Sequence, residues 1–141
     1  MGENNVAIVL DYLDGLHHGD KGRMAQHLAS DAVYWILPGT AFSGTHNKTD
    51  FLALVDNLLG AQSGPLELKI GNITAQDGRV AIVVNGRMPL KSGGTYDNVY
   101  HWLFTLREGK IVYVKEFFDT LAVWKAFGTP EQAAAAEAAT A

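Results

Sequence analysis

The sequence predicts an α+β fold in which a curved antiparallel sheet wraps around helices from the N-terminal half. Three observations support this prediction. Apolar residues recur at helical spacing in residues 4–17 and 47–60, strand-like runs fill much of residues 66–118, and short turns separate those runs. Helices first and hairpin-connected strands afterwards are the order expected of an α+β protein. A curved sheet of this kind can enclose a conical, apolar interior.

The N-terminal half is predicted to contain three helices and one strand. Apolar residues three and four positions apart, among them Val9, Tyr12 and Leu16, indicate an amphipathic helix. Gly19 ends this pattern, and Pro38 closes an apolar strand. In order, the expected elements are a helix at residues 4–17, a shorter helix at 21–28, a strand at 32–37, a loop at 39–46 and a helix at 47–60.

The second half is predicted to form four strands in hairpin succession and a closing helix. Turn sequences at 76–78, 91–94 and 108–109 separate the strand-like runs. The expected elements are strands at 66–70, 79–90, 95–106 and 110–118 and a helix at 119–127. Residues 1–128 are therefore expected to be a single domain, and residues 129–141 an alanine-rich tail that need not be ordered.

Length and composition limit the class of protein. A chain of 141 residues, 48% hydrophobic and 18% charged, fits one globular domain. The net charge of −4 without a basic cluster argues against binding to nucleic acid. No apolar run is long enough to span a membrane and no signal peptide is recognisable, so we expect no membrane association and a cytoplasmic location. No metal is assigned to His17, His18 or His46, which lack a further ligand at a useful spacing.

The most specific local prediction is a hairpin formed by residues 95–119. If Glu108 and Gly109 are its turn, side chains pair outward from that turn, and His101 lies directly opposite Glu116. Because side chains alternate, one face would carry Val99, His101, Leu103, Thr105, Val112, Val114, Glu116 and Phe118. The other face would carry the aromatic and apolar set of Tyr100, Trp102, Phe104, Ile111, Tyr113 and Phe117.

Neither face of this hairpin has the polar alternation of a solvated sheet, so both are expected to be covered. The larger, aromatic face predicts a homodimer interface on the outside of the sheet. The face with His101 and Glu116 would then line the interior. These two residues form either a weak cross-strand ion pair or a general acid/base pair in which the carboxylate orients the imidazole, and we favour the second.

Several segments resemble a known superfamily. They are the order of the elements, the Gly19-Asp20 break, SDAV at 30–33 leading into a strand, and LREGKI at 106–111 followed by EFFDT at 116–120. Together they resemble the SnoaL-like and ketosteroid-isomerase-like domains of the nuclear-transport-factor-2-like superfamily, over about residues 6–127. The resemblance implies a cone-shaped sheet around N-terminal helices, a fold shared by isomerases, cyclases, dehydratases, epoxide hydrolases and binding modules.

The resemblance also implies roles for individual residues. Tyr12 matches the ketosteroid isomerase tyrosine that hydrogen-bonds a developing oxyanion, and His101 matches that enzyme's second oxyanion donor. The isomerase's proton-shuttling aspartate should come just before Pro38, where this chain has apolar residues including Ile36, and this leaves Glu116 as the available carboxylate. SnoaL-like polyketide cyclases use a histidine and an acidic residue from the late strands, and they resemble this arrangement better.

Limonene-type epoxide hydrolases offer a third comparison, because they use an Asp-Arg-Asp constellation. Arg87 matches the arginine, but Pro89 stands where one aspartate is needed. Arg87 remains a candidate cation for a carboxylate or enolate oxygen, or a solvated strand charge. The candidate pocket-wall residues are Trp35, Leu103, Val114 and Phe118.

We therefore expect a cofactor-independent enzyme that acts on a small hydrophobic carbonyl compound by enolisation, cyclisation or dehydration. His101 and Glu116 would be its acid/base pair, and Tyr12 would donate to the oxyanion. Two alternatives stay open. One is a non-catalytic module that binds a small hydrophobic ligand or dimerises, and the other is an epoxide-hydrolase-like enzyme.

Overall fold

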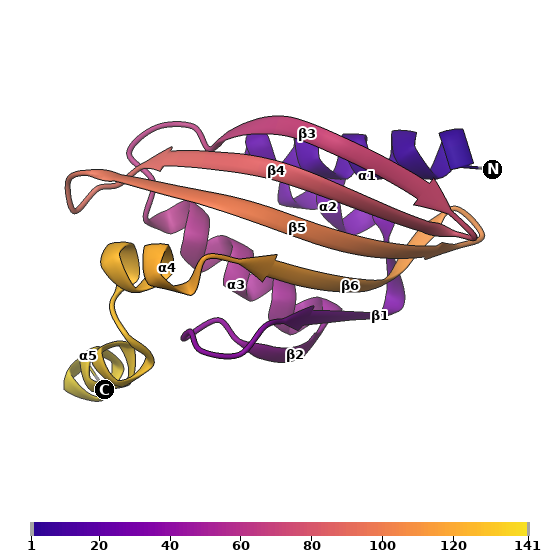
Figure 1. The fold of residues 1–141 in the computed structure, drawn as a ribbon. Helices are drawn as coiled ribbons and strands as arrows, with labels where there is room; N and C mark the ends of the chain where they lie inside the picture. Colours follow the sequence, from indigo (N-terminus) through magenta and orange to yellow (C-terminus); the bar gives the residue numbers. More distant parts are fainter. Residues whose placement is uncertain (1, 141) are drawn as a thin grey trace.

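The computed structural model describes residues 2–140, which form five helices and six strands (Figure 1). Along the chain these are α1 (Gly2–His17), α2 (Lys21–His27), β1 (Leu28–Ile36), β2 (Gly44–Asn47), α3 (Lys48–Gly60), β3 (Glu67–Gln76), β4 (Arg79–Pro89), β5 (Thr95–Arg107), β6 (Lys110–Phe118), α4 (Thr120–Phe127) and α5 (Pro130–Thr140).

One curved, unclosed sheet organises the molecule. Its strand order is β2-β1-β6-β5-β4-β3, so β2 and β3 are its edges. All neighbouring strands are antiparallel except β1 and β6, which run parallel. Helices α1, α2 and α3 lie on one side of this sheet (Figure 1). The predicted α+β fold with a curved antiparallel sheet around N-terminal helices is confirmed.

Two tight turns set the long hairpins. Asp77 and Gly78 join β3 to β4, and Glu108 and Gly109 join β5 to β6, all four with positive φ between 52° and 77°. Two successive residues of positive φ are the signature of a two-residue turn whose twist matches that of the strands. The turn prediction at 108–109 is therefore confirmed.

Beyond that turn, the hairpin of β5 and β6 contains a β-bulge that the sequence analysis missed. Leu106 pairs with Ile111 as predicted, but the next pair joins Thr105 to Tyr113, which leaves Val112 as an extra residue. A shift of one residue moves every later side chain to the opposite face. The predicted pairing of His101 with Glu116 is therefore wrong.

Past the bulge, Glu116 lies opposite Trp102, and His101 lies opposite Phe117. Trp102 is buried, whereas His101 beside it on β5 is exposed. The assignment of faces changes with the register. Inward-facing positions now include Tyr100, Trp102, Phe104, Ile111, Val114 and Glu116, and outward-facing positions include Val99, His101, Leu103, Thr105, Tyr113 and Phe117.

This reassignment corrects the predicted dimer surface. Tyr100, Trp102 and Phe104 are buried within the chain itself and leave almost no surface for a partner. Of the predicted aromatic face, Tyr113 and Phe117 do lie on the outside of the sheet. Aromatic side chains were the right signal for a covered face, but α1 and α3 cover it rather than a second subunit.

Four segments differ from the predicted elements. The strand expected at 66–70 continues to Gln76 as β3. The strand expected at 32–37 begins earlier, because residues 28–36 pair with β6. The loop expected at 39–46 contains the short edge strand β2, which pairs with β1. The alanine-rich tail forms helix α5, in keeping with the high helix propensity of alanine.

The core lies between the inner face of the sheet and the helices. Tyr12 of α1 packs edge to face on Phe104 of β5, with ring centroids 5.7 Å apart. Side-chain caps fix where helices begin. Asp20 accepts a hydrogen bond from the Arg23 backbone at the start of α2, and Asn47 caps α3 in the same way.

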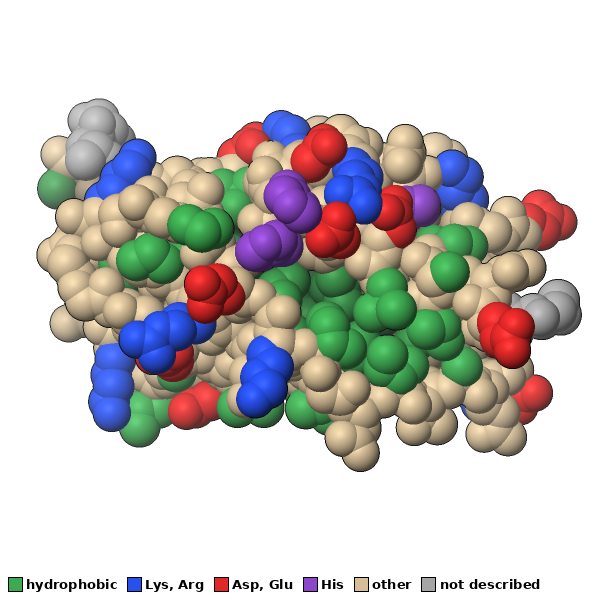
Figure 2. Space-filling view, turned by 90° about the horizontal axis from the view of Figure 1, so that it is seen from above, with side chains coloured by type: hydrophobic (Ala, Val, Ile, Leu, Met, Phe, Trp, Pro, Cys, Tyr) green, Lys and Arg blue, Asp and Glu red, His purple; other side chains and the backbone are tan. Residues whose placement is uncertain are grey.

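Charged side chains join α1 to α2 at the surface. The Arg23 guanidinium binds Asp11 and lies 2.7 Å from Asp14, and His27 Nε2 lies 2.6 Å from the second Asp11 oxygen. These contacts, Arg23 first, lower the pKa of Asp11 to about 2. Figure 2 shows histidine, acidic and basic side chains gathered on this face beside an apolar area. Because the pairs are partly exposed, they orient the helices more than they stabilise the fold.

No helix formed by residues 2–140 is both long enough and apolar enough to cross a membrane.

Helix α5 projects from the body of the protein (Figure 1), and nearly all of its described side chains are exposed or half-buried. We predict that deleting residues 130–141 changes the free energy of unfolding by less than about 0.5 kcal/mol, as expected for surface changes. Urea denaturation of the two proteins measures this. Val123→Ala is the control, because its buried side chain lies in the preceding helix, and its loss should cost about 1–3 kcal/mol. A larger loss on deletion than in this control would show that α5 belongs to the domain.

Candidate active site

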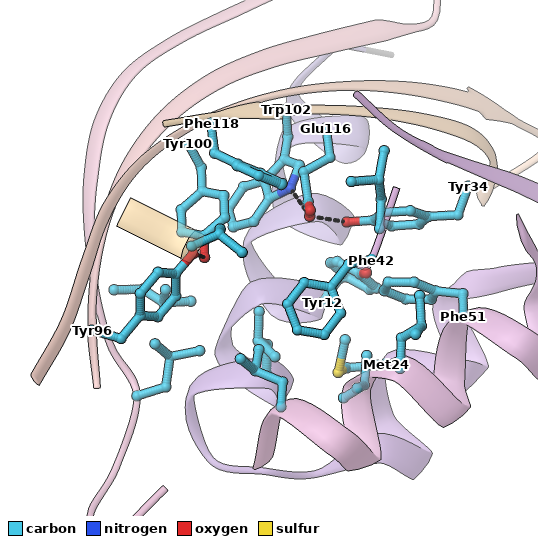
Figure 3. A pocket seen from close by; sticks show the side chains of 18 of the residues that line it. Tyr12, Met24, Tyr34, Phe42, Phe51, Tyr96, Tyr100, Trp102, Glu116 and Phe118 are labelled. Carbon is cyan, nitrogen blue, oxygen red and sulfur yellow. Dashed lines mark hydrogen bonds between the residues drawn. The ribbon is translucent and has the colours of Figure 1, made fainter. Parts of the chain in front are cut away.

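A pocket lies between the inner face of the sheet and helices α1, α3 and α4. Its cavity offers about 80 Å³ to water-sized spheres, several times the space that one water molecule needs. Aromatic and aliphatic side chains make up most of the wall (Figure 3). Such an apolar cavity with a few polar groups is the usual form of a small-molecule site.

Glu116 provides the one carboxylate among the described residues that line this pocket. Its carboxylate reaches the cavity from β6, and its Oε1 atom accepts two hydrogen bonds, one from the Tyr34 hydroxyl at 2.7 Å and one from Trp102 Nε1 at 2.6 Å (Figure 3). No donor to the other oxygen, Oε2, is found among residues 2–140. One carboxylate oxygen is thus fixed by the protein, and the other is free to meet a ligand.

Three strands bring these groups together. Tyr34 is on β1, which runs parallel to β6 beside Glu116, and Trp102 is the cross-strand neighbour of Glu116 on β5. The Tyr34 ring is stacked on Phe51 of α3, with centroids 3.7 Å apart. Trp102 is stacked in turn on Tyr100, with centroids 4.8 Å apart. The rings hold both donors in place before any ligand arrives.

Burial raises the pKa of Glu116 above its ordinary value, because the charged form loses water that the apolar cavity does not replace. The hydrogen bonds from Trp102 and Tyr34, and the more distant charge of His46, oppose this rise but do not cancel it. A carboxyl group with a raised pKa can give up and take back a proton nearer neutral pH than an exposed one.

Tyr12 contributes a hydroxyl without a partner. Its side chain enters the pocket from α1 (Figure 3), it is 2% exposed, and its hydroxyl makes no hydrogen bond to any of residues 2–140. Burial, and then the nearby Glu116 carboxylate, raise the pKa of Tyr12 well above its ordinary range, and the neighbouring Tyr34 hydroxyl, which is outside hydrogen-bond geometry, opposes this rise only in part. The hydroxyl therefore keeps its proton and is available as a donor to a ligand oxygen.

A second polar group lies in the part of the pocket wall formed by β5. The hydroxyls of Tyr96 and Tyr100 are 2.6 Å apart, and Asn98 Nδ2 donates to the Tyr96 oxygen at 2.8 Å. All three residues face inward from β5, at alternate positions. Burial raises the pKa of Tyr96 to about 12, so this hydroxyl too stays protonated at neutral pH.

The structure separates the residues that the sequence analysis had placed together. His101 is exposed on the outer face of β5 and is not part of the cavity wall. Glu116 and Tyr12 do line the cavity, as does Phe118. The predicted acid/base pair of His101 with Glu116 is therefore not formed, while the predicted carboxylate and tyrosine share one pocket.

Four other candidates lie away from the cavity. Arg87 is exposed and lies 3.8 Å from Asp97 on the outside of the sheet. Leu103 faces outward on β5, and Trp35 packs on Phe117 on the outer face, with centroids 5.3 Å apart. Val114 faces inward but is fully buried in the packed core rather than in the cavity wall.

The partners of the carboxylate were not predicted from the sequence. Tyr34 and Trp35 are neighbours on one strand and point to opposite sides, and no local pattern shows which of them faces the cavity. Trp102 was assigned to the wrong face by the register error. The alternation of Tyr96, Asn98 and Tyr100 was visible in the sequence and marks one face of a strand.

No group of three or more metal-ligating side chains is found within residues 2–140.

Comparison with known proteins identifies the family. A search among curated proteins found no match. Among solved structures, an NTF2-like protein from Burkholderia xenovorans LB400 is 26% identical, with a TM-score of 0.73, over 89% of this chain and 97% of that one. Bal32a, from a soil-derived mobile gene cassette, is 17% identical, with a TM-score of 0.80, over 89% and 98% of the chains. A putative SnoaL-like polyketide cyclase from Jannaschia sp. CCS1 is 20% identical, with a TM-score of 0.76, over 90% and 93%.

These structures show a shared NTF2-like fold. The sequence model of the SnoaL-like domain matches residues 9–114. Since this match spans most of the chain, the protein belongs to the SnoaL-like domain family.

Proposed function

We propose that this protein is an enzyme that moves a proton at the carbon next to the carbonyl group of a small apolar compound. Glu116 acts as the base, and Tyr12 stabilises the oxyanion. The observation that carries the proposal is a carboxyl group of raised pKa, with one oxygen free, in the same apolar pocket as an unpartnered tyrosine hydroxyl.

In the proposed step, Glu116 Oε2 takes a proton from the α-carbon. The C–H bond breaks, and its electron pair forms the double bond of the enolate. The electrons of the carbonyl bond move to oxygen, where the Tyr12 O–H donates to the developing charge. Tyr34 and Trp102 hold Oε1 throughout, so the carboxylate need not reorient as it gains the proton.

The pocket wall favours a neutral ligand. The cavity is lined mainly by apolar side chains, and the lining residues within the described chain include no lysine, arginine or histidine. An anionic substrate would lose its water without gaining a cation in return. Arg87, the cation considered from the sequence, lies outside, so a carboxylate or phosphate substrate is not supported.

The comparisons are compatible with this reaction class. One neighbour of the same fold is described as a putative SnoaL-like polyketide cyclase and another as a putative hydroxylase. Their identities to this chain, 20% and 16%, support the fold rather than one reaction. The expected cytoplasmic location and independence from a cofactor remain predictions.

One prediction of this proposal concerns the exchange of α-hydrogens with solvent. Incubated with 1-tetralone in D₂O, the wild-type protein should exchange the hydrogens beside the carbonyl faster than buffer, as followed by NMR. Glu116→Gln should lower the rate about 10²- to 10⁴-fold, the range for loss of a general base. Tyr12→Phe should lower it by about 10²- to 10³-fold, the range for loss of one oxyanion donor.

His101→Ala is the matched control for this assay, because its side chain is on the outer face. It should retain the wild-type rate within about twofold, in line with surface substitutions elsewhere. If wild-type protein exchanges neither 1-tetralone nor any other bicyclic or monocyclic ketone that it binds, catalysis is refuted and the pocket is a binding site. If His101→Ala loses exchange while Glu116→Gln keeps it, the assignment of the base is refuted.

Another prediction concerns how the exchange rate depends on pH. The base must be ionised, so the exchange rate should fall on acidification through the pKa of Glu116, which lies above the ordinary carboxyl range. Tyr34→Phe removes a donor that stabilises the charged form and therefore raises that pKa further. The acidic limb of the rate profile should move to higher pH in Tyr34→Phe and stay in place in Tyr113→Phe, which lies on the outer face. A profile that does not move, or moves to lower pH, would contradict this role of Tyr34.

We also infer that the protein forms a homodimer through the outer face of the sheet, with residues other than those first expected. Val83 pairs with His101, and His101 pairs with Phe117, whose ring lies against Trp35, so the four side chains form one row across β4, β5, β6 and β1. Val83 and Phe117 are 36% and 38% exposed. No helix formed by residues 2–140 covers this side of the sheet (Figure 1), and a second copy would bury the same row on both subunits.

Sedimentation at micromolar concentration tests the dimer. Wild-type protein should sediment as a dimer, and Phe117→Glu should weaken the dimer at least tenfold, because a charge would be buried at its centre. Leu121→Glu is the control, since Leu121 is 51% exposed on α4, away from the sheet. A wild-type protein that is only monomeric, or a Leu121 variant as defective as the Phe117 variant, would refute the interface.

A further inference from the structure

The hydroxyls of Tyr96 and Tyr100 form a pair that the proposed reaction does not use. They lie 2.6 Å apart in the pocket wall, and both side chains are buried, with 4% and 8% exposed. Figure 3 shows the two hydroxyls meeting to one side of the contacts of Glu116 with Tyr34 and Trp102, with the rings of Tyr100 and Trp102 between them. A polar pair in this position needs its own explanation.

The hydrogen bonds of the pair can be counted. Two hydroxyls carry two hydrogens, and only one hydrogen can lie between the two oxygens. Asn98 cannot accept the second one through Nδ2, which donates to the Tyr96 oxygen and to the Asp119 carbonyl. Whichever tyrosine donates within the pair, the other hydroxyl keeps a hydrogen with no acceptor among residues 2–140.

The orientation of Asn98 is fixed by the backbone. Its Oδ1 atom accepts from the backbone nitrogens of Val99 at 2.8 Å and Asp119 at 2.9 Å. The amide oxygen must therefore face these two donors, and the amide nitrogen must face Tyr96. The whole group thus presents a donor toward the pocket, and the side chain that holds it is 5% exposed.

The pair also has a defined position relative to the carboxylate. Tyr100 is the inward-facing residue next to Trp102 on β5, and Trp102 is the cross-strand partner of Glu116. Adjacent inward positions on a strand are roughly 7 Å apart. The stacked rings of Tyr100 and Trp102 form a flat wall between the two polar groups.

We propose that the hydroxyls of Tyr96 and Tyr100 form a second contact point for the substrate and bind an oxygen acceptor at the end remote from its reacting carbonyl. The ligand is then a flat, neutral compound with two well-separated oxygen atoms, such as a ring ketone that carries a second carbonyl, ether or hydroxyl oxygen. This inference rests on the proposed function for the placement of the reacting carbonyl, while the donor pair itself can be tested by binding alone.

Two probes of the same shape test the contact. In 6-methoxy-1-tetralone the remote substituent contains an oxygen acceptor, and in 6-ethyl-1-tetralone a methylene group replaces that oxygen. Wild-type protein should bind the methoxy compound about 3- to 10-fold more tightly, which corresponds to one neutral hydrogen bond. Titration calorimetry, or quenching of the fluorescence of Trp102 in the pocket wall, measures both dissociation constants.

Variants identify the donor. Either Tyr96→Phe or Tyr100→Phe leaves one hydroxyl with a free hydrogen, so each single variant should keep the preference for the methoxy compound. The double variant has no hydroxyl there, and its preference should fall to about one. Tyr113→Phe, on the outer face, should keep the wild-type preference and serves as the control. Thermal melting of all four proteins shows whether they remain folded under the conditions of the titration.

The outcomes separate this inference from the proposed reaction. Glu116→Gln should lose hydrogen exchange and still prefer the methoxy compound, because the two groups act at different ends of the pocket. Equal binding of the two probes by wild-type protein overturns the inference, and so does a folded double variant that keeps the preference. Either result leaves the exchange assay of Glu116 as it stands, and a failed exchange assay leaves the binding preference as it stands.

Discussion

A single extra residue in β6 decides what the interior of this protein contains. Val112 bulges out of the ladder between β5 and β6, and every side chain after it changes face. With the bulge, Glu116 points into the cavity, opposite Trp102. Without it, Glu116 would lie opposite His101, which faces outward, Lys115 would lie opposite Trp102, and the pocket would lose its carboxylate. The chemistry of the site thus follows from a local irregularity of the backbone.

Much of the fold could be predicted because local chemistry determines it. Helical spacing located α1 and α3, and the paired residues at 108–109 located the turn of the last hairpin. The bulge had no such signal. After Ile111, uninterrupted alternation would place Tyr113 on the inward face, whereas the bulge places Val114 there, and both residue types are common in strands. Turn chemistry therefore fixes the start of a ladder but not its continuation.

The site was less predictable because its members are far apart in sequence. Tyr34 reaches Glu116 through the parallel pairing of β1 with β6, across 82 positions. No spacing rule connects residues at that separation, whereas the alternation of Tyr96, Asn98 and Tyr100 within one strand is a local pattern. The family resemblance supplied Tyr12, which lines the pocket, but its match of His101 to an oxyanion donor fails because His101 lies on the outer face of β5.

The energetic balance at Glu116 explains why two aromatic donors are needed. A carboxyl group without hydrogen-bond donors in an apolar cavity would lose its proton only at high pH. It would stay protonated near neutral pH and could not act as a base there. The hydrogen bonds from Trp102 and Tyr34 recover part of the lost hydration and keep the group within reach of ionisation. Both donors bind Oε1 and leave Oε2 free, so the residues that make ionisation possible do not block the atom that would receive a proton.

The same reasoning applies to the hydroxyls that lack an acceptor. A buried donor without a partner costs free energy, and folded proteins contain few of them. Here two donors, Tyr12 and one of the pair Tyr96 and Tyr100, face one cavity from different walls. A ligand that supplies both acceptors relieves both costs, while a ligand that supplies one leaves the other donor unpaired. Selection between similar apolar compounds can therefore come from the positions of their oxygen atoms, which a purely apolar cavity could not distinguish.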